Sequence, residues 1–369
     1  MNSTVGTDLE PVWRRTLFSP VVDGRVTVFR WAFVIGSIAH LWLADPWRDA
    51  EWLPANVLFI IGLVLVALRG ASTGFFLCAL GAVIPVLWHH DQLSQSVILA
   101  LMSLGAGYYT MRGAPEGVLA TARGLTIVTY LAAFFHKLNG DFLSTEVSCA
   151  VYGADQLSTY WGGVVPEGFW HGQMGYAAIV AVLVVELALA VLLLIGMRWV
   201  AWPVAVAFHI PLTLTMAPAF VFVMAAGLSA FVTEDDISLV RRHARLILLS
   251  LVPGAGLTIG SLWAHGSLPE LSMLPKELLL WSALVGLIGV IVVRRQLLLS
   301  DIRWPERLPA VAMVIVALYT VNVMAPYCGL KFQHSAAMLS NLRIDAGCWN
   351  HVLVPERIRL AEHYVRVDD

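Results

Sequence analysis

The stretch YAAIVAVLVVELALAVLLLI, residues 176–195, decides the fold class of this chain. It is a continuous apolar run interrupted only by Glu186, and about 20 such residues form a helix that crosses the hydrocarbon core of a bilayer. The whole chain has the same character, since 59% of its 369 residues are hydrophobic and only 13% are charged. Soluble domains have roughly 45–50% apolar and about 25% charged residues. We therefore expect an integral membrane protein that folds as an all-α, polytopic helical bundle, because a helix satisfies its own backbone groups in lipid.

Similar apolar runs recur along the chain, broken by Pro, Gly or charged residues, and they predict about eleven transmembrane helices. Two short runs meet at Ala217-Pro218 and predict a tilted or broken hairpin. The predicted spans are 26–43, 53–69, 72–88, 94–110, 122–136, 176–196, 199–216, 218–233, 246–263, 277–293 and 308–325.

Basic residues alternate between the connecting segments. The predicted outer loops before the tail carry only Arg48, Lys137 and Lys276. The other connections carry clusters such as Arg14-Arg15, Arg241-Arg242 and Arg294-Arg295. Because positive residues stay on the cytoplasmic side, we expect the N-terminus inside and the C-terminus outside.

The domain organisation follows from this topology. Residues 1–325 form a single transmembrane domain with a long outer loop at 137–175, and residues 326–369 form an extracytoplasmic tail. The tail carries Asn341, Arg343, Asn350 and His351 but few apolar residues, so we expect it to fold back over the outer mouth of the bundle. The 14 Trp indicate contact with membrane lipids at the interface. A net charge of −2 without a basic cluster gives no indication of nucleic-acid binding, and the oligomeric state is left open.

The four cysteines show no CxxC motif and no His/Cys spacing typical of a metal site. Cys149, Cys328 and Cys348 lie in predicted outer segments, where disulfides persist in a bacterial cytoplasmic (inner) membrane protein. Any two of the three are candidates for pairing or for redox activity. The cluster at 89–91 has adjacent histidines, which rarely chelate one ion well, so we interpret it as a solvated turn and predict no metal.

Ionisable side chains inside apolar runs are functional candidates because they are costly at membrane depth. Glu186 and His209 lie near the middle of their predicted spans, and Arg30 lies in the first. The alternative for Glu186 and His209 is a buried polar pair that fixes helix packing. The alternative for Arg30 is a guanidinium that reaches the interface or clamps neighbouring helices.

Lys137 ends the aromatic-rich segment YLAAFFHKLNGDF, residues 130–142. A poorly hydrated lysine favours the neutral amine, which is able to act as a base. The alternative is an interfacial lysine whose ammonium group reaches water. His136 is one residue away and faces elsewhere on a helix, so we expect it to support or to pack.

Four segments together resemble the HTTM (horizontally transferred transmembrane) family, which is similar to the membrane domain of vitamin K-dependent gamma-carboxylase. The 130–142 segment resembles the family's lysine-bearing helix end, although Ser94-Gln95 stands where the family has an asparagine-histidine motif. The other matching segments are LFSPVVDGR at 17–25 with Phe29-Arg30, Glu186 followed by Phe208-His209 and FVFVMAAGL at 220–228, and the tail motifs at 326–331, 338–343 and 349–351.

This resemblance implies an activity. In the carboxylase the matching lysine deprotonates vitamin K hydroquinone, oxygen then converts the product into a strong base, and carbon dioxide traps a peptide carbanion. The resemblance therefore implies that Lys137 is the catalytic base and that the cofactor is a quinone or hydroquinone of the vitamin K kind. Eleven spans leave no room for the carboxylase's large extramembrane domain.

We interpret the chain as a membrane-embedded enzyme that uses a lipid-soluble quinol to modify a peptide or small substrate at an outward-facing site. Its chemistry is either carboxylase-like or that of a quinone-dependent oxidoreductase. Two alternatives remain open. One is a quinone-linked thiol redox accessory protein that uses the outer cysteines, and the other is a non-enzymatic protein of membrane transport or assembly.

Overall fold

The computed structural model describes residues 23–44, 53–88, 94–162, 165, 168–265, 274–298, 307–329, 340–344 and 348–360. Within these ranges the fold is all-α, without a strand, and one isolated bridge joins Asn139 to His351. The helical fold class expected from the apolar runs is confirmed. The cluster at 89–91 lies outside the described residues.

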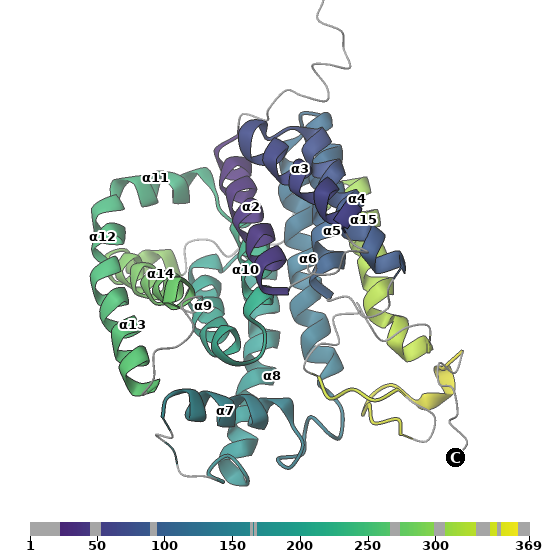
Figure 1. Cartoon of the computed structure of the whole chain (residues 1–369), viewed down its shortest axis with the longest axis vertical. Coiled ribbons are helices and arrows are strands. Elements are labelled where there is room, and N and C mark those ends of the chain that lie inside the picture. Colours follow the sequence, from purple (N-terminus) through teal and green to yellow (C-terminus); the bar gives the residue numbers. More distant parts are fainter. Residues whose placement is uncertain are drawn as a thin grey trace, which may run out of the picture.

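Most predicted spans fall on one helix each (Figure 1), whereas the span 246–263 falls on two, which are separated at Ser250. The outer loop at 137–175 contains an additional helix, α7. The bounds are α2 Gly24–Ala44, α3 Leu53–Arg69, α4 Ser72–Trp88, α5 Ser94–Met111, α6 Pro115–His136, α7 Cys149–Tyr160, α8 Gln173–Leu194, α9 Arg198–Thr215, α10 Pro218–Ser229, α11 Glu234–Arg242, α12 Ala244–Leu249, α13 Leu251–His265, α14 Leu274–Val293 and α15 Ala310–Met324, with short 3₁₀ turns η2 Arg295–Leu298, η3 Ala325–Cys328 and η4 Glu356–Ile358.

Five helical stretches in the described residues are long and apolar enough to cross a membrane. They are Pro115–His136, Gln173–Leu194, Ala244–Ala264, Leu274–Val293 and Ala310–Cys328. Shorter apolar helices accompany them, among them α3 and most of α10. The chain is therefore compatible with an integral membrane protein, as its composition indicates.

The predicted hairpin of two short spans is formed by α9 and α10. Pro203 and Pro211 lie inside α9, and the chain turns at Met216 and Ala217 before Pro218 opens α10. Proline is tolerated at the first position of a helix, where the missing N–H has no partner to lose. The turn places the end of α9 and the start of α10 beside the same space.

Two groups of helices meet along α6. The first group, α2, α3, α4, α5, α10 and α15, shares one apolar core with α6. The second core joins α8, α9 and α10 to α6, and α14 and α13 pack outside α9. Helices α6 and α10 contribute residues to both cores. The space between the two groups of helices is therefore lined by residues of both groups.

Small residues bring α3 and α4 into close contact. A Cβ at Gly62 would lie 2.6 Å from the Gly74 carbonyl oxygen, and a Cβ at Gly74 would lie 2.8 Å from the Gly62 carbonyl oxygen. Glycine at both positions therefore permits backbone contact, which is how helices associate in lipid without a hydrophobic driving force.

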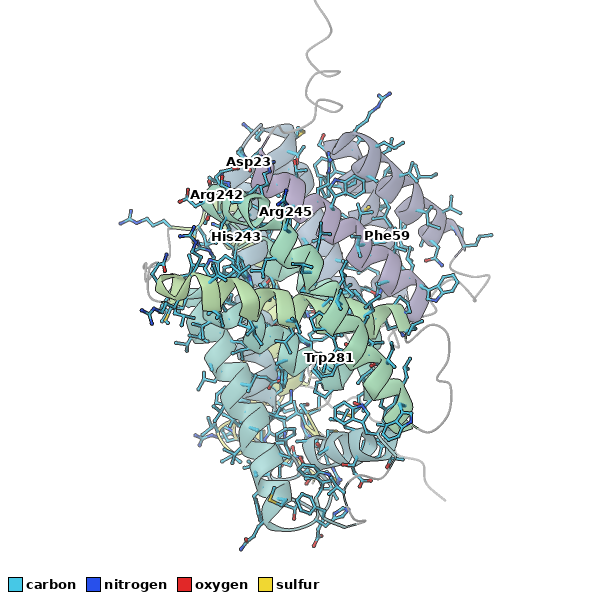
Figure 2. The ribbon with its side chains drawn as sticks, turned by 90° about the vertical axis from the view of Figure 1, so that its left-hand side faces the viewer. Asp23, Phe59, Arg242, His243, Arg245 and Trp281 are labelled. Atoms are coloured by element: carbon cyan, nitrogen blue, oxygen red, sulfur yellow. The ribbon has the colours of Figure 1, made fainter. Side chains whose placement is uncertain are left out.

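The two ends of the molecule carry different segments. Asp23, Arg242 and Arg245 lie near one end (Figure 2). The α7 helix and the described part of the tail lie at the other end (Figure 1). The candidate site lies toward the end that carries α7.

Candidate functional site

Lys137 caps the C-terminus of α6, where its backbone N–H donates to the Phe134 carbonyl at 3.1 Å. Its side chain turns back along the helix, so that Nζ lies 3.4 Å from the carbonyl oxygen of Ala133. Only 5% of the residue is exposed, and the Phe142 ring centroid lies 5.7 Å from Nζ. The lysine is therefore buried among aromatic and aliphatic groups instead of reaching water.

Glu186 on α8 meets this lysine. Nζ of Lys137 donates to Oε1 of Glu186 at 2.8 Å, and both side chains are 6% exposed. The second carboxylate oxygen, Oε2, is buried and has no hydrogen-bond partner among the described residues. Because buried polar atoms are normally paired, an open acceptor at this position is a marker of a ligand or water site.

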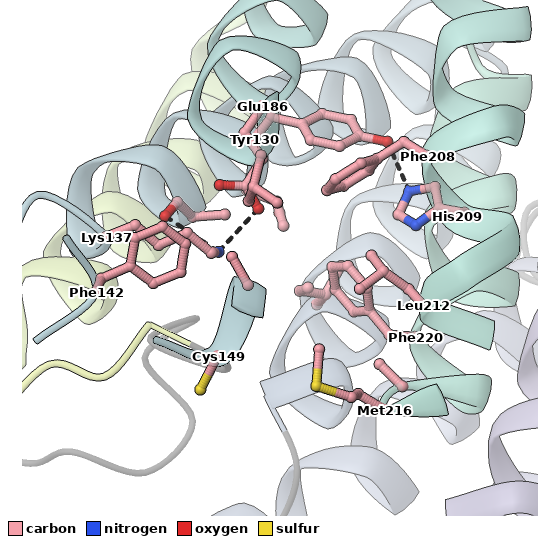
Figure 3. Close-up of a pocket in the computed structure, with 16 residues that line it drawn as sticks. Tyr130, Lys137, Phe142, Cys149, Glu186, Phe208, His209, Leu212, Met216 and Phe220 are labelled. Carbon is pink, nitrogen blue, oxygen red and sulfur yellow. Dashed lines mark hydrogen bonds and ion pairs between the residues drawn. The ribbon is translucent and has the colours of Figure 1, made fainter. Parts of the chain in front are cut away.

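A pocket with about 740 Å³ of empty space, including its open mouth, contains this contact (Figure 3). Apolar side chains from six helices and the loop after α6 form most of its wall, and Lys137 and Glu186 are among the few polar groups on it. The lining residues are Ile98, Thr129, Tyr130, Ala133, Lys137, Phe142, Cys149, Ala150, Val182, Glu186, Phe208, His209, Leu212, Met216, Ala217 and Phe220.

A second polar contact lies on the same wall. The hydroxyl of Tyr130 lies 3.0 Å from Nε2 of His209, and both residues are buried. Nδ1 of His209 has no partner within the described part of the chain. The sequence marks His209 but not Tyr130 as a candidate. The spacing could have found it, because Tyr130 precedes Lys137 by seven residues and so shares its helix face.

Cys149 brings α7 to the pocket. Ser148 caps this helix by accepting a hydrogen bond from the backbone N–H of Ala150, and the backbone N–H of Cys149 donates to Oδ1 of Asn341 at 2.7 Å. Burial raises the pKa of the Cys149 thiol, and the nearby charge of Lys137 opposes that shift. All four cysteines are free, so none of the considered disulfides is present, and Cys328 and Cys348 do not line the pocket.

The tail packs against the end of α6 through three side-chain amides. Asn139 donates through Nδ2 to the carbonyls of His136 at 2.8 Å and Ser340 at 2.6 Å. Nδ2 of Asn350 donates to the Asn341 carbonyl at 2.8 Å. Nδ2 of Asn341 donates to the Val147 carbonyl at 2.8 Å. The bonds of Asn139 to Ser340 and of Asn341 to Val147 tie the loop between Lys137 and Cys149 to the tail.

His351 adds a further tie. Its Nε2 lies 3.0 Å from the Phe135 carbonyl, to which it donates, while its Nδ1 accepts from the backbone N–H groups of Leu353 and Val354 at 3.2 and 3.0 Å. This pattern requires the neutral imidazole, because only one ring nitrogen carries a proton. Burial lowers the pKa of His351, and the hydrogen bond to Phe135 opposes the shift in part.

The remaining candidate residues lie either near the contact between the tail and α6 or away from it. Nδ1 of His136 lies 2.7 Å from the hydroxyl of Tyr327, on the tail side of α6. Arg343 pairs with Asp141 at 2.6 Å in an exposed position. Arg30 lies beside Gly70 at the end of α3 and does not line the pocket. Four candidates therefore share the pocket, Lys137, Glu186, His209 and Cys149, and the tail residues support its rim.

Comparisons with protein-family models, with curated proteins and with solved structures find no match for this chain. Among the described residues, no group of three or more His, Cys, Asp or Glu side chains is arranged to hold a metal ion. The chemistry of the site is therefore inferred from the pocket itself.

Proposed function

We propose that the chain is a membrane-embedded enzyme that takes a proton from a lipid-soluble quinol bound in this pocket. Its second substrate is a peptide or small molecule on the outer side of a bacterial cytoplasmic membrane. The observation that carries the proposal is the buried contact between Lys137 and Glu186, whose second carboxylate oxygen is open in an otherwise apolar pocket. The resemblance of residues 130–142 to the lysine-bearing helix end of the carboxylase family supports the same residue as the base.

The residues fit a quinol. Apolar walls such as Phe208 and Phe220 suit a ring and its hydrocarbon substituents. The unpartnered Oε2 of Glu186 suits a hydroxyl group. When bound, a quinol supplies a weakly acidic hydroxyl and two electrons.

Proton transfer follows from the pairing. In the proposed reaction Nζ of Lys137 passes one proton to the carboxyl of Glu186, to which it donates at 2.8 Å, and is left as a neutral amine. Nζ then accepts the proton of the bound hydroxyl, and the resulting ammonium group lies beside the oxygen that has lost it. The apolar wall strengthens this attraction because it excludes water.

A substitution by arginine tests the base. Arginine keeps the positive charge and reaches an interface equally well, but it is not deprotonated in proteins. We therefore expect Lys137→Arg to slow oxygen-dependent consumption of menadiol by the purified chain at least about 100-fold, the lower range for general-base catalysis. The matched control is Lys276→Arg, another buried lysine, on α14. An active Lys137→Arg variant with a normal thermal melt would end the base assignment.

A quinone-linked thiol redox role is the second candidate, because Cys149 lines the same pocket. Reduction of a quinone by thiols takes two electrons and two protons and leaves one disulfide, so Cys149 would need Cys328 or Cys348 as its partner. Cys149→Ser abolishes turnover in that role and leaves it intact if Lys137 is the base. A chain that neither binds menadiol nor responds to either substitution has the non-enzymatic role in transport or assembly.

A further inference from the structure

Two polar groups face one pocket, and each has a buried atom without a partner. We call Lys137 with Glu186 the outer pole and Tyr130 with His209 the inner pole. In the described structure the open atoms are Oε2 of Glu186 and Nδ1 of His209. Both residues are at least nine-tenths buried, at 5% and 2% exposed.

The two poles are neighbours along α6. Nζ of Lys137 returns to the level of Ala133, and Ala133 follows Tyr130 by three residues, or about 4.5 Å along the helix axis. Figure 3 shows the two contacts at separate places on the pocket wall, with apolar side chains such as Leu212 and Phe220 lining the rest. A ligand that fills the pocket therefore lies against residues of both poles.

The inner pole adapts to the oxygen it meets. When Nε2 of His209 donates to Tyr130, Nδ1 is a free acceptor that suits a hydroxyl group. When the hydroxyl of Tyr130 donates to Nε2 instead, Nδ1 carries the proton and suits a carbonyl oxygen. The pair thus changes from acceptor to donor when the imidazole carries its proton on Nδ1 instead of Nε2 and the tyrosine hydroxyl turns to donate to Nε2.

We infer that the ligand carries oxygen groups on opposite edges of one ring, and that Tyr130 and His209 hold the oxygen farther from Lys137. A single ligand of this class gives partners to both open atoms, whereas a ring with one hydroxyl leaves one of them unpaired. The inference rests on the proposed function, because it concerns the same pocket and the same quinol. It adds that the inner pole binds the second oxygen.

The test compares two probes on the full chain in lipid nanodiscs without oxygen. Menadiol has two opposed hydroxyls, and 2-methyl-1-naphthol lacks one of them. We expect the wild-type chain to bind menadiol about tenfold more tightly than the naphthol, because the naphthol leaves one buried polar group unmet. His209→Phe is expected to remove this preference by weakening menadiol alone, and Tyr130→Phe is expected to reduce it.

The control is Tyr319→Phe, which removes another buried hydroxyl of the bundle that does not line the pocket and bonds to Thr129. This variant is expected to keep the preference. If His209→Phe fails to fold, Tyr130→Phe decides, since it removes one oxygen atom only. If the wild-type chain binds both probes equally and Lys137→Met weakens that binding, the role of the inner pole is wrong. The proposed function then still stands. Absence of menadiol binding overturns both.

Discussion

Two buried ion pairs of this chain differ in how completely their carboxylates are satisfied. At the end that carries α11, Asp236 accepts from Arg198, Thr233 and Trp199. Its Oδ1 and Oδ2 both have partners. In the pocket, Glu186 accepts from Lys137 through one oxygen, and its other oxygen has no partner in the described structure.

The difference separates a structural pair from a functional one. A carboxylate that uses both oxygens within the fold has nothing left for a ligand, and the capping box of Thr233 and Asp236 gives it a helix-starting role. A buried carboxylate with an open oxygen in a pocket is costly for stability and is retained where function needs it. The cation differs in the same sense, since arginine holds its proton and lysine gives it up.

The largest expected effect tests this comparison through stability. Asp236→Asn removes the carboxylate charge that pairs with the buried Arg198 guanidinium, and breaking a buried ion pair costs about 3–5 kcal/mol. Glu186→Gln is expected to cost clearly less, because a lysine side chain, unlike arginine, can become neutral in an apolar site. Thermal melts of both variants in the same detergent measure the two effects. Equal losses would contradict the distinction between the pairs.

The sequence predicts the positions of the helices because span length and composition are local properties. Lys137, Glu186, His209 and Cys149 are also visible as unusual residues in their segments. The 3.0 Å contact between Tyr130 and His209 is not, because it depends on how α6 and α9 pack, 79 residues apart in sequence. The ties made by Asn139 and His351 to the tail are long-range for the same reason, and a buried tyrosine or asparagine looks ordinary in an apolar run.

A smaller effect concerns the tail, whose tie to α6 should depend on pH. The pKa of His351 is lowered by burial, so the released tail takes up a proton at a higher pH than the docked tail does. Docking is therefore complete above the ordinary histidine pKa of about 6.5 and weakens as pH falls below it, by up to about tenfold per pH unit. Hydrogen exchange of residues 340–344 and 348–354 between pH 7.5 and 5, corrected for intrinsic exchange, measures this. His351→Gln should flatten the dependence, and an unchanged profile in that variant would refute it.

The smallest expected effect concerns Asn341, which joins the tail to the loop before α7 and is not part of either ion pair. Its side chain accepts from the backbone N–H of Cys149 and donates to the Val147 carbonyl, and its own backbone has a positive φ of 53°. Asn341→Gly keeps that conformation and removes the two hydrogen bonds, so we expect a loss of about 1–2 kcal/mol. Asn341→Ala adds strain of roughly 1 kcal/mol, because a Cβ is disfavoured at positive φ.

Alkylation of Cys149, in a chain whose other cysteines are serine, gives the second readout for this pair of variants. Loss of the Asn341 contacts frees the loop that covers the thiol, so both variants should react several-fold faster than the parent chain. The Asn341→Ala variant should melt at a lower temperature than Asn341→Gly, because strain at residue 341 destabilises the tail. The two variants should be alkylated at the same rate, because this strain does not act on the thiol. A parent-like alkylation rate in both variants would show that the tail does not restrain the pocket rim, and its role would then be confined to stability.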